Sequence, residues 1–177
     1  MKKVVLLLSS AFLATSVNAE SGFEVGLGFA SRSIDSFATN GSRSEALSDS
    51  DSGASLTLGA SQKLGSSQFG VQVVIPNSED DWYHLDGFYN HYLTSNAYVG
   101  GVLGYMSFSS EYRGLEVDYS GVSAGVKTGY SFSDKLSMDL TYRFLTGDKD
   151  KQNFDFVGVT VESEITEILE LSLRAHF

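Results

Sequence analysis

Residues 165–177 read Ile-Thr-Glu-Ile-Leu-Glu-Leu-Ser-Leu-Arg-Ala-His-Phe. Near the end of this stretch, apolar residues stand at every odd position, and Glu170, Ser172 and Arg174 stand between them. A period of two is typical of a β-strand with one apolar face and one polar face. The odd positions that we assign to the apolar face are Ile165, Leu169, Leu171, Leu173, Ala175 and Phe177.

The same alternation recurs along most of the chain. It predicts further strands at residues 21–31, 53–63, 68–75, 82–92, 117–130 and 135–145. Residues 97–108 are apolar at both odd and even positions, so they predict a strand whose facing stays open. No sustained helical period occurs after the first residues of the chain. The sequence therefore predicts an all-β protein with eight strands.

The connections between these strands alternate in length. Short turns are expected at 64–67, 93–96 and 131–134, and longer loops at 32–52, 76–81, 109–116 and 146–156. Short turns at one end and long loops at the other are typical of an antiparallel up-and-down transmembrane β-barrel, whose strands need about 9–11 residues to cross a bilayer. Residues 153–163 either extend the last strand or form an extra hairpin.

The polar positions of the strands indicate which face points inward. Gly, Ser, Thr and Gln dominate them, as expected for the lumen of an eight-stranded barrel, which is only just wide enough for side chains. A soluble barrel would instead turn its polar face to water. The charged lumen residues, mixed in sign, are Glu24, Asp86, Lys127, Asp139, Arg143, Glu170 and Arg174. We expect them to pair across the lumen and fill it; the alternative places them near the rims in solvent.

Aromatic residues lie toward the ends of several predicted strands. Amphipathic rings favour the boundary between membrane and water, although aromatic residues also favour strands in general. The residues expected at this boundary are Tyr83, Tyr89, Tyr98, Tyr130, Tyr142 and Phe144.

The first 19 residues have the layout of a secretory signal peptide. Lys2 and Lys3 precede an apolar run, and Val17-Asn18-Ala19 places small or compact residues before the expected cleavage point. The run is too short to span a bilayer of about 30 Å. We therefore expect residues 1–19 to be removed on export and residues 20–177 to form one barrel domain.

The final strand resembles that of bacterial outer-membrane β-barrel proteins, which ends in an aromatic residue, usually Phe. In that family this strand is the recognition signal for the barrel-insertion machinery, and here the match consists of Leu169, Leu171, Leu173 and Phe177. Ala175 departs from the pattern, where the family often has a second aromatic. With eight strands, the whole chain after residue 19 looks like the small barrels of the OmpX/Ail type, the opacity type and the OmpA transmembrane domain. The resemblance implies the outer membrane, its lipid and lipopolysaccharide, and periplasmic chaperones as partners.

Composition excludes several other functions. The chain has no cysteine, which rules out disulfides and thiolate metal sites. Without Lys2 and Lys3, 10 basic residues face 22 acidic ones, a net charge of −12 that argues against nucleic acid as a partner. No cofactor motif occurs, because the glycine pairs fall inside strands with no helix behind them. Acidic groups in the long loops suit divalent cations or simply form a hydrated negative cap; they are Asp49 with Asp51, Glu79 to Asp81, and Asp148 with Asp150.

No set of catalytic residues stands out. Some small barrels that deacylate lipid A carry His and Ser two residues apart, and this chain has no His-x-Ser; His84 with Asp86 is all that remains of such a site. We therefore predict a non-enzymatic outer-membrane barrel with a plugged lumen and acidic outer loops, in a structural or surface-interaction role. The alternatives are a narrow porin-like conduit, a lipid-modifying enzyme that uses His84, and a soluble periplasmic barrel that binds an apolar ligand.

Overall fold

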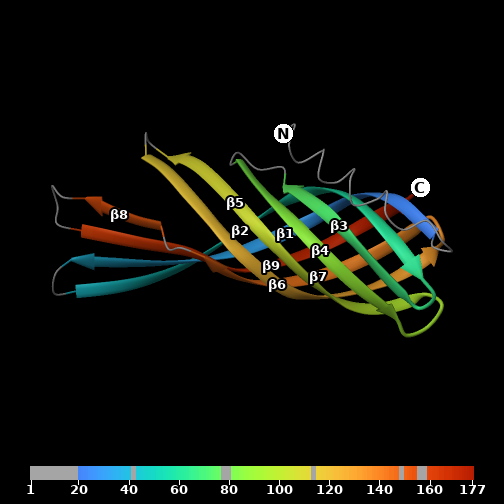
Figure 1. Ribbon diagram of the computed structural model, residues 1–177. Helices are drawn as coiled ribbons and strands as arrows, with labels where there is room; N and C mark the ends of the chain where they lie inside the picture. The colour runs from blue at the N-terminus through green and yellow to red at the C-terminus, as the bar shows by residue number, and fades with distance from the viewer. Residues whose placement is uncertain (1–19, 41–42, 77–80, 113–114, 148–149, 155–158) are drawn as a thin grey trace.

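The computed structural model describes residues 20–40, 43–76, 81–112, 115–147, 150–154 and 159–177, so the predicted signal peptide lies outside the described residues. Within these ranges, nine antiparallel strands make up one sheet (Figure 1). Their bounds are β1 Glu20–Asn40, β2 Arg43–Leu64, β3 Ser67–Pro76, β4 Asp81–Tyr92, β5 Ala97–Tyr112, β6 Leu115–Ser133, β7 Leu136–Gly147, β8 Asp150–Phe154 and β9 Val159–His176.

Eight of these strands close into a barrel. Each of β1 to β7 pairs with its neighbour in the chain, β9 pairs with β7, and β9 returns to β1. The seam between β1 and β9 includes two reciprocal backbone hydrogen bonds between Phe23 and Phe177, with N–O distances of 3.1 and 2.9 Å. The prediction of an eight-stranded up-and-down barrel is confirmed, and β8 is an additional ninth strand outside the barrel wall.

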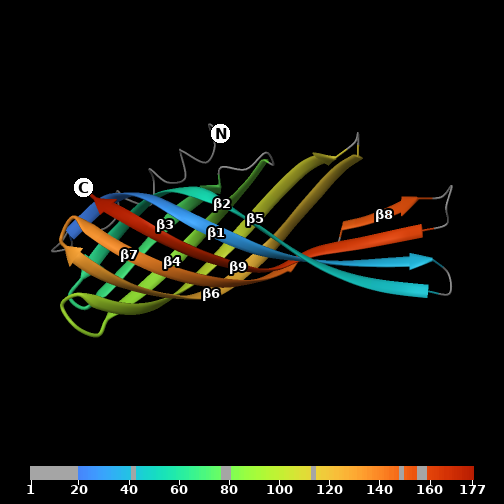
Figure 2. The same ribbon diagram turned by 180° about the vertical axis from the view of Figure 1, so that it is seen from behind.

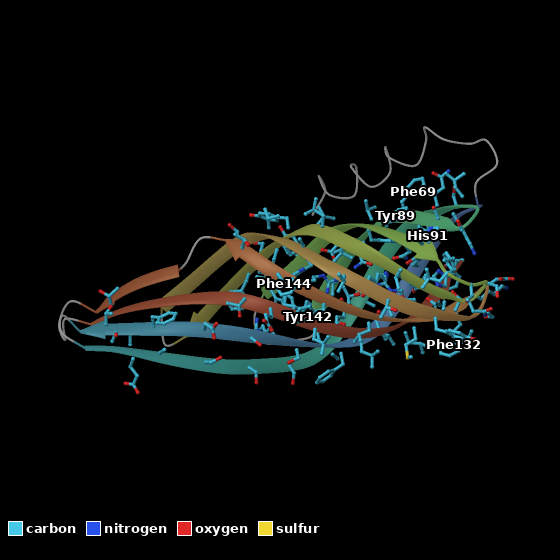
Figure 3. All side chains as sticks on the ribbon, turned by 90° about the horizontal axis from the view of Figure 1, so that it is seen from below. Phe69, Tyr89, His91, Phe132, Tyr142 and Phe144 are labelled. Atoms are coloured by element: carbon cyan, nitrogen blue, oxygen red, sulfur yellow. The ribbon has the colours of Figure 1, made fainter. Side chains whose placement is uncertain are left out.

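The alternation of the sequence becomes the two faces of the barrel wall. Large apolar side chains are exposed on the outside of every barrel strand, whereas polar and charged side chains are buried inside. Figure 3 labels six side chains of the outer face, of which only Tyr142 is partly covered: Phe69, Tyr89, His91, Phe132, Tyr142 and Phe144. This is the arrangement of a membrane barrel and the reverse of a soluble one. No helix in the described ranges is long and apolar enough to cross a membrane.

One end of the barrel, which we call the turn end, carries the short connections and the C-terminus (Figure 1). Leu93 and Thr94 donate backbone hydrogen bonds to Ala97 in the turn between β4 and β5. In the turn between β2 and β3, Gly65 has a φ of 59°, a left-handed conformation that glycine adopts without steric cost. Compact turns of this kind hold the adjacent strands in register.

The opposite end differs from the prediction of long loops. Residues 32–52 were expected to be a loop, yet β1 and β2 stay paired from Glu20 with Lys63 to Asn40 with Arg43. The hairpin persists because β9 continues to pair with the other edge of β1 as far as Thr39. Most of 109–116 and part of 146–156 are also strand.

The parts of β1, β2 and β9 that lie farthest from the turn end, together with β8, form a four-stranded sheet that projects beyond the barrel (Figures 1 and 2). We call this sheet, residues 31–40, 43–54, 150–154 and 159–168, the extension. For residues 153–163 the sequence left open an extended last strand or an extra hairpin, and the structure contains features of both. β9 is one long strand, and β8 pairs with its N-terminal part, from Asp150 with Ser163 to Phe154 with Val159.

A β-bulge in β9 corrects the predicted facing of Ile165. Ser33 of β1 pairs with Glu167 and Ile34 pairs with Ile165, so Thr166 is an extra residue without a partner on β1. The bulge reverses the alternation on β9, so Ile165 is buried inside together with Ile168, which shares the inward alternation of Glu170. The sequence had placed Ile165 on the outer face with the leucines.

The facing of β5 corrects a second expectation. Gly104 pairs with Asp86, which points into the lumen, so the even residues of β5 face inward. Tyr98 is consequently buried rather than at the membrane boundary, and its hydroxyl donates a hydrogen bond to Asp139. Its ring packs against Tyr92 with 5.1 Å between the ring centroids.

Candidate functional site

The lumen of the barrel is where the charged residues singled out in the sequence come together. All seven, Glu24, Asp86, Lys127, Asp139, Arg143, Glu170 and Arg174, are at most 3% exposed. They lie on five strands, β1, β4, β6, β7 and β9, and they form two adjoining groups. Each of the four carboxylates lies in an ion pair with a lysine or arginine.

The first group is centred on Arg143. Its guanidinium contacts Asp86 through Nη2 at 2.8 Å and Nε at 3.2 Å, and it contacts Glu170 through Nη1 at 2.9 Å. Each of these carboxylates also accepts a hydrogen bond from a neutral side chain. Gln72 Nε2 donates to Asp86 at 3.0 Å, and Thr57 Oγ1 donates to Glu170 at 3.2 Å. One arginine therefore forms ion pairs with two carboxylates that stand on different strands.

The second group lies nearer the turn end and is centred on Arg174. Arg174 bridges Glu24, at 3.3 Å, and Asp139. Lys127 Nζ lies 3.2 Å from Asp139 and stacks over the ring of Phe88 at 4.5 Å. A buried charge needs both a counter-charge and hydrogen bonds, and this group supplies both.

Neutral polar side chains complete the network; sequence reasoning expected Ser and Gln at lumen positions but did not foresee their bonds to the charged residues. Gln72 joins the two groups, because its Oε1 accepts a hydrogen bond from Arg174 Nη1 at 2.7 Å while its amide nitrogen donates to Asp86. Ser61 and Gln68 donate to Glu24 at 2.5 and 3.0 Å. All three stand at inward positions of their strands, and this alternation was the available signal.

Glycines in the wall make room for the network. A Cβ on Gly104 would lie 3.1 Å from Asp86 Cγ and 2.7 Å from the carbonyl oxygen of Leu85. A Cβ on Gly26 would lie 3.1 Å from Arg174 Cγ. Glycine at these inward positions thus lets a charged side chain lie against the backbone of the neighbouring strand.

An apolar layer covers the network on the side of the extension. Trp82, Met106, Ile165 and Ile168 form a buried cluster, with Phe108 and Leu145 packed against it. The guanidinium carbon of Arg32 lies 5.5 Å from the ring centroid of Trp82 and 5.0 Å from that of Phe108, within the range of cation–π attraction. Sequence reasoning did not foresee this layer, because Ile165 faces inward only through the bulge at Thr166 and the facing of β5, which carries Met106, stayed open.

His84 lies at the junction of the polar network and the apolar layer. It is 1% exposed, and its ring meets that of Trp82 edge-on at 5.5 Å. Nδ1 lies 3.9 Å from Asp86 Oδ1, and neither ring nitrogen has a hydrogen-bond partner among the described residues. In this position His84 does not form the hydrogen bond to a hydroxyl that a nucleophilic triad requires.

The remaining predicted residues are those of the assembly signal on β9 and those of the acidic loops. Leu169, Leu171, Leu173 and Phe177 are exposed on the outer face of β9. The side chains of the acidic loop residues Asp49, Asp51, Asp81 and Asp150, and the whole of Glu79, Asp80 and Asp148, lie outside what the structure describes. Within the described part, no three His, Asp or Glu side chains are grouped so that they could hold a metal ion.

Comparison with known proteins gives likeness at the level of the fold. No family model matches the chain, and no curated protein matches it. Among solved structures, the outer membrane protein OprG from Pseudomonas aeruginosa is similar with a TM-score of 0.50 and 14% identity, covering 89% of this chain and 96% of that chain. Neisserial surface protein A (TM-score 0.49, 19% identity, 91% and 100% covered) and the attachment invasion locus protein Ail of Yersinia pestis (0.49, 13%, 89% and 99%) also match. The likeness to OprG is one of fold, and it agrees with the small eight-stranded barrel that the sequence had indicated.

Proposed function

We propose that this protein is a non-enzymatic outer-membrane barrel with a sealed lumen, which anchors the extension at the cell surface for contact with other molecules. The observation that carries the proposal is the filling of the lumen. The ion pairs centred on Arg143 and Arg174 occupy the barrel, and the apolar layer around Met106 covers them. An eight-stranded barrel has little further space for a channel.

The outer face supports a membrane as the surroundings of the barrel. Leucine, valine and phenylalanine side chains are exposed around the whole wall, an apolar surface far larger than a soluble monomer tolerates. We infer that outer-membrane lipid covers this belt and that lipopolysaccharide surrounds the base of the extension. With the turn end toward the periplasm, the strand ending in Phe177 would be presented to the insertion machinery.

Conductance measurements test the sealed lumen. Purified, folded protein in planar bilayers is expected to give no stepwise ion conductance. A variant with Arg143→Ala, Arg174→Ala and Met106→Ala removes the centres of both ion-pair groups and the middle of the apolar layer. This variant is expected to conduct if it folds, which shows that the recording detects an open lumen. Stepwise conductance of the wild-type protein would overturn the proposal in favour of a narrow conduit.

Gel mobility tests the membrane barrel independently of conductance. Closed barrels usually stay folded in detergent until they are boiled, because every edge of the barrel is paired. We expect the protein in the outer-membrane fraction and a change in its mobility on boiling. Recovery from the soluble periplasm without a mobility change would contradict the proposal. Lipid A and phospholipid profiles that differ between overexpressing and deletion strains would contradict the non-enzymatic part.

A further inference from the structure

His84 is a buried titratable residue that takes no part in the ion pairs sealing the lumen. Its side chain is 1% exposed, and both ring nitrogens lack a hydrogen-bond partner among the described residues. A polar group in a buried site normally forms a hydrogen bond, because burial without one costs free energy. An apolar residue of similar size would fill the same space without this cost. The imidazole therefore has a role other than packing.

A proton on His84 would meet charges of both signs in the lumen. On β4 itself, Oδ1 of Asp86 lies 3.9 Å from Nδ1 of His84, and Arg143 of β7 and Glu170 of β9 act on the imidazole from across the lumen. Arg143 already contacts Asp86 at 2.8 and 3.2 Å, so a protonated His84 would share that carboxylate with an arginine. Sharing leaves the new charge only partly neutralised, and such a buried charge attracts water.

Apolar side chains and one further cation lie around the rest of the ring. The residues opposite His84 on β3 and β5 are Val74 and Met106, which are buried and do not titrate. The ring of Trp82 meets that of His84 edge-on at 5.5 Å, and the guanidinium carbon of Arg32 on β1 lies 5.5 Å from the same Trp82 ring. A proton on His84 would thus place a second cation beside Trp82, within the apolar layer.

The apolar layer joins the barrel to the extension. Ile165 and Ile168 belong to the extension, whereas Trp82 and Met106 stand on β4 and β5, on the other side of the lumen. The layer therefore ties the base of the extension to two strands that do not continue into it. Water drawn in by a charge on His84 would separate these side chains and loosen the base.

We propose that His84 is a proton-operated switch of the extension: when the imidazole gains a proton, water enters the apolar layer and the extension becomes mobile. The neutral imidazole leaves the layer dry and keeps the extension in the position that the structure shows. Contact with other molecules then weakens as the pH falls. This inference rests on the surface-contact role proposed above and adds its regulation.

The fluorescence of Trp82, the single tryptophan of the chain, tests the entry of water. Refolded protein in lipid nanodiscs is titrated from about pH 7.5 to about pH 3.5, a range that includes the ordinary pKa of histidine. Quenching of Trp82 by acrylamide is expected to increase about threefold as water reaches the ring. In His84→Gln, which cannot gain the proton, the increase is expected to stay below about 1.3-fold. Equal increases in the two proteins would overturn the inference, since carboxyl groups titrate in the same range.

A spin label tests the motion of the extension. Because the chain has no cysteine, Ser48→Cys in the extension and Ser66→Cys at the turn end each introduce one labelling site, and both positions are exposed. On acidification the rotational correlation time of the label at position 48 is expected to shorten about twofold, and that of the label at position 66 to stay constant. Addition of His84→Gln is expected to abolish the change at position 48. A label at position 48 that keeps its correlation time throughout the titration would overturn the inference.

Two further variants separate His84 from other titrating groups. His84→Lys carries a permanent charge and is expected to show at about pH 7.5 the quenching that the wild type shows in acid. A folded His84→Lys variant with wild-type quenching would overturn the inference, and if it does not fold, the comparison with His84→Gln decides. His91→Gln, at an exposed position of the same strand, is expected to keep the full acid response, and loss of the response there would also overturn it. Gel mobility and conductance near neutral pH report on the sealed barrel, so an intact, silent barrel without an acid response overturns only this inference.

Discussion

Arg143 offers the sharpest test of the sealed lumen. Its guanidinium makes three contacts, at 2.8, 2.9 and 3.2 Å, with Asp86 and Glu170, and all three side chains are at most 1% exposed. In Arg143→Met, two buried carboxylates lose their counter-charge, although Gln72 and Thr57 still donate to them. Breaking a buried pair by removing one partner costs about 3–5 kcal/mol.

The magnitude is large enough to measure directly. A loss of about 4 kcal/mol raises the unfolding equilibrium constant about a thousandfold. With an m-value of about 2 kcal/mol per molar urea, the unfolding midpoint falls by about 2 M. Trp82 is the single tryptophan of the chain and lies in the apolar layer beside His84, so its fluorescence follows unfolding in lipid vesicles without a label.

A charge-neutral variant is the matched control for Arg143→Met. Arg143→Met combined with Asp86→Asn and Glu170→Gln removes all three charges together. Its free energy of unfolding is expected to lie within about 1 kcal/mol of that of the wild type, because none of these three charges remains unpaired. If the free energy of unfolding of Arg143→Met alone also stays within about 1 kcal/mol of the wild type, and this variant keeps its mobility shift, then water screens the lumen charges. That result would refute the view of the lumen as a dry, sealed network.

Three further predictions concern the wall. Gly104→Ala is expected to lower the free energy of unfolding by about 1–3 kcal/mol in the same urea assay, because its Cβ crowds a buried carboxylate. Gly87→Ala, whose Cβ has no heavy atom closer than 3.8 Å, is expected to change this free energy by less than about 1 kcal/mol. Equal losses in the two variants would contradict the packing argument. Deletion of Thr166 is expected to be tolerated, because its neighbours Ile165 and Glu167 already pair with the consecutive residues Ile34 and Ser33 of β1. Deletion of Leu171 instead reverses the faces of β9 on one side of the deletion and is expected to abolish the mobility shift. A folded Leu171 deletion would refute this. Phe177→Ala is expected to refold normally in detergent but to lower the folded fraction in cells, and unchanged cellular folding would argue against an assembly signal.

The strands of the barrel were predictable because one physical rule governs each of them. In β7, for example, Leu136, Met138 and Leu140 alternate with Ser137 and Asp139, and the structure turns the first set outward and the second inward. Bilayer and lumen impose opposite demands on adjacent residues, so the period of two is strong. Where both sets are apolar, as in β5, the same rule gave no facing.

What could not be predicted depends on contacts between strands. The extra residue Thr166 reverses the facing of Ile165, and nothing in the local sequence marks it, since the bulge is defined against β1. Tyr98 is amphipathic and would suit the membrane boundary, yet its hydroxyl donates a hydrogen bond to the carboxylate of Asp139 inside the barrel. The partner of each lumen charge likewise depends on strand tilt and register, which position Arg143 between Asp86 and Glu170.

The lumen charges have a further consequence for β9, because they fix its register. A slip by one residue would turn Glu170 and Arg174 outward to lipid and bring leucines into the lumen. An arginine near the middle of the bilayer costs about 2–4 kcal/mol on the lipid face, in addition to the loss of its ion pairs. The lumen charges therefore raise the free energy of a misaligned barrel by more than they lower the free energy of the correctly aligned one.

This reasoning makes a last prediction about the charge-neutral variant of Arg143, Asp86 and Glu170. Its free energy of unfolding is expected to stay near that of the wild type, as stated above, but its specificity of folding is expected to fall. The variant removes the penalty for exposing Glu170 and leaves Arg174 as the one charged lumen residue of β9 that opposes a slip. Slipped barrels are therefore expected to compete more during refolding, which is visible as several heat-modifiable gel bands and several sets of amide resonances. A single band and a single set of resonances would show that the leucines of the outer face, together with the ion pairs around Arg174, suffice to fix the register.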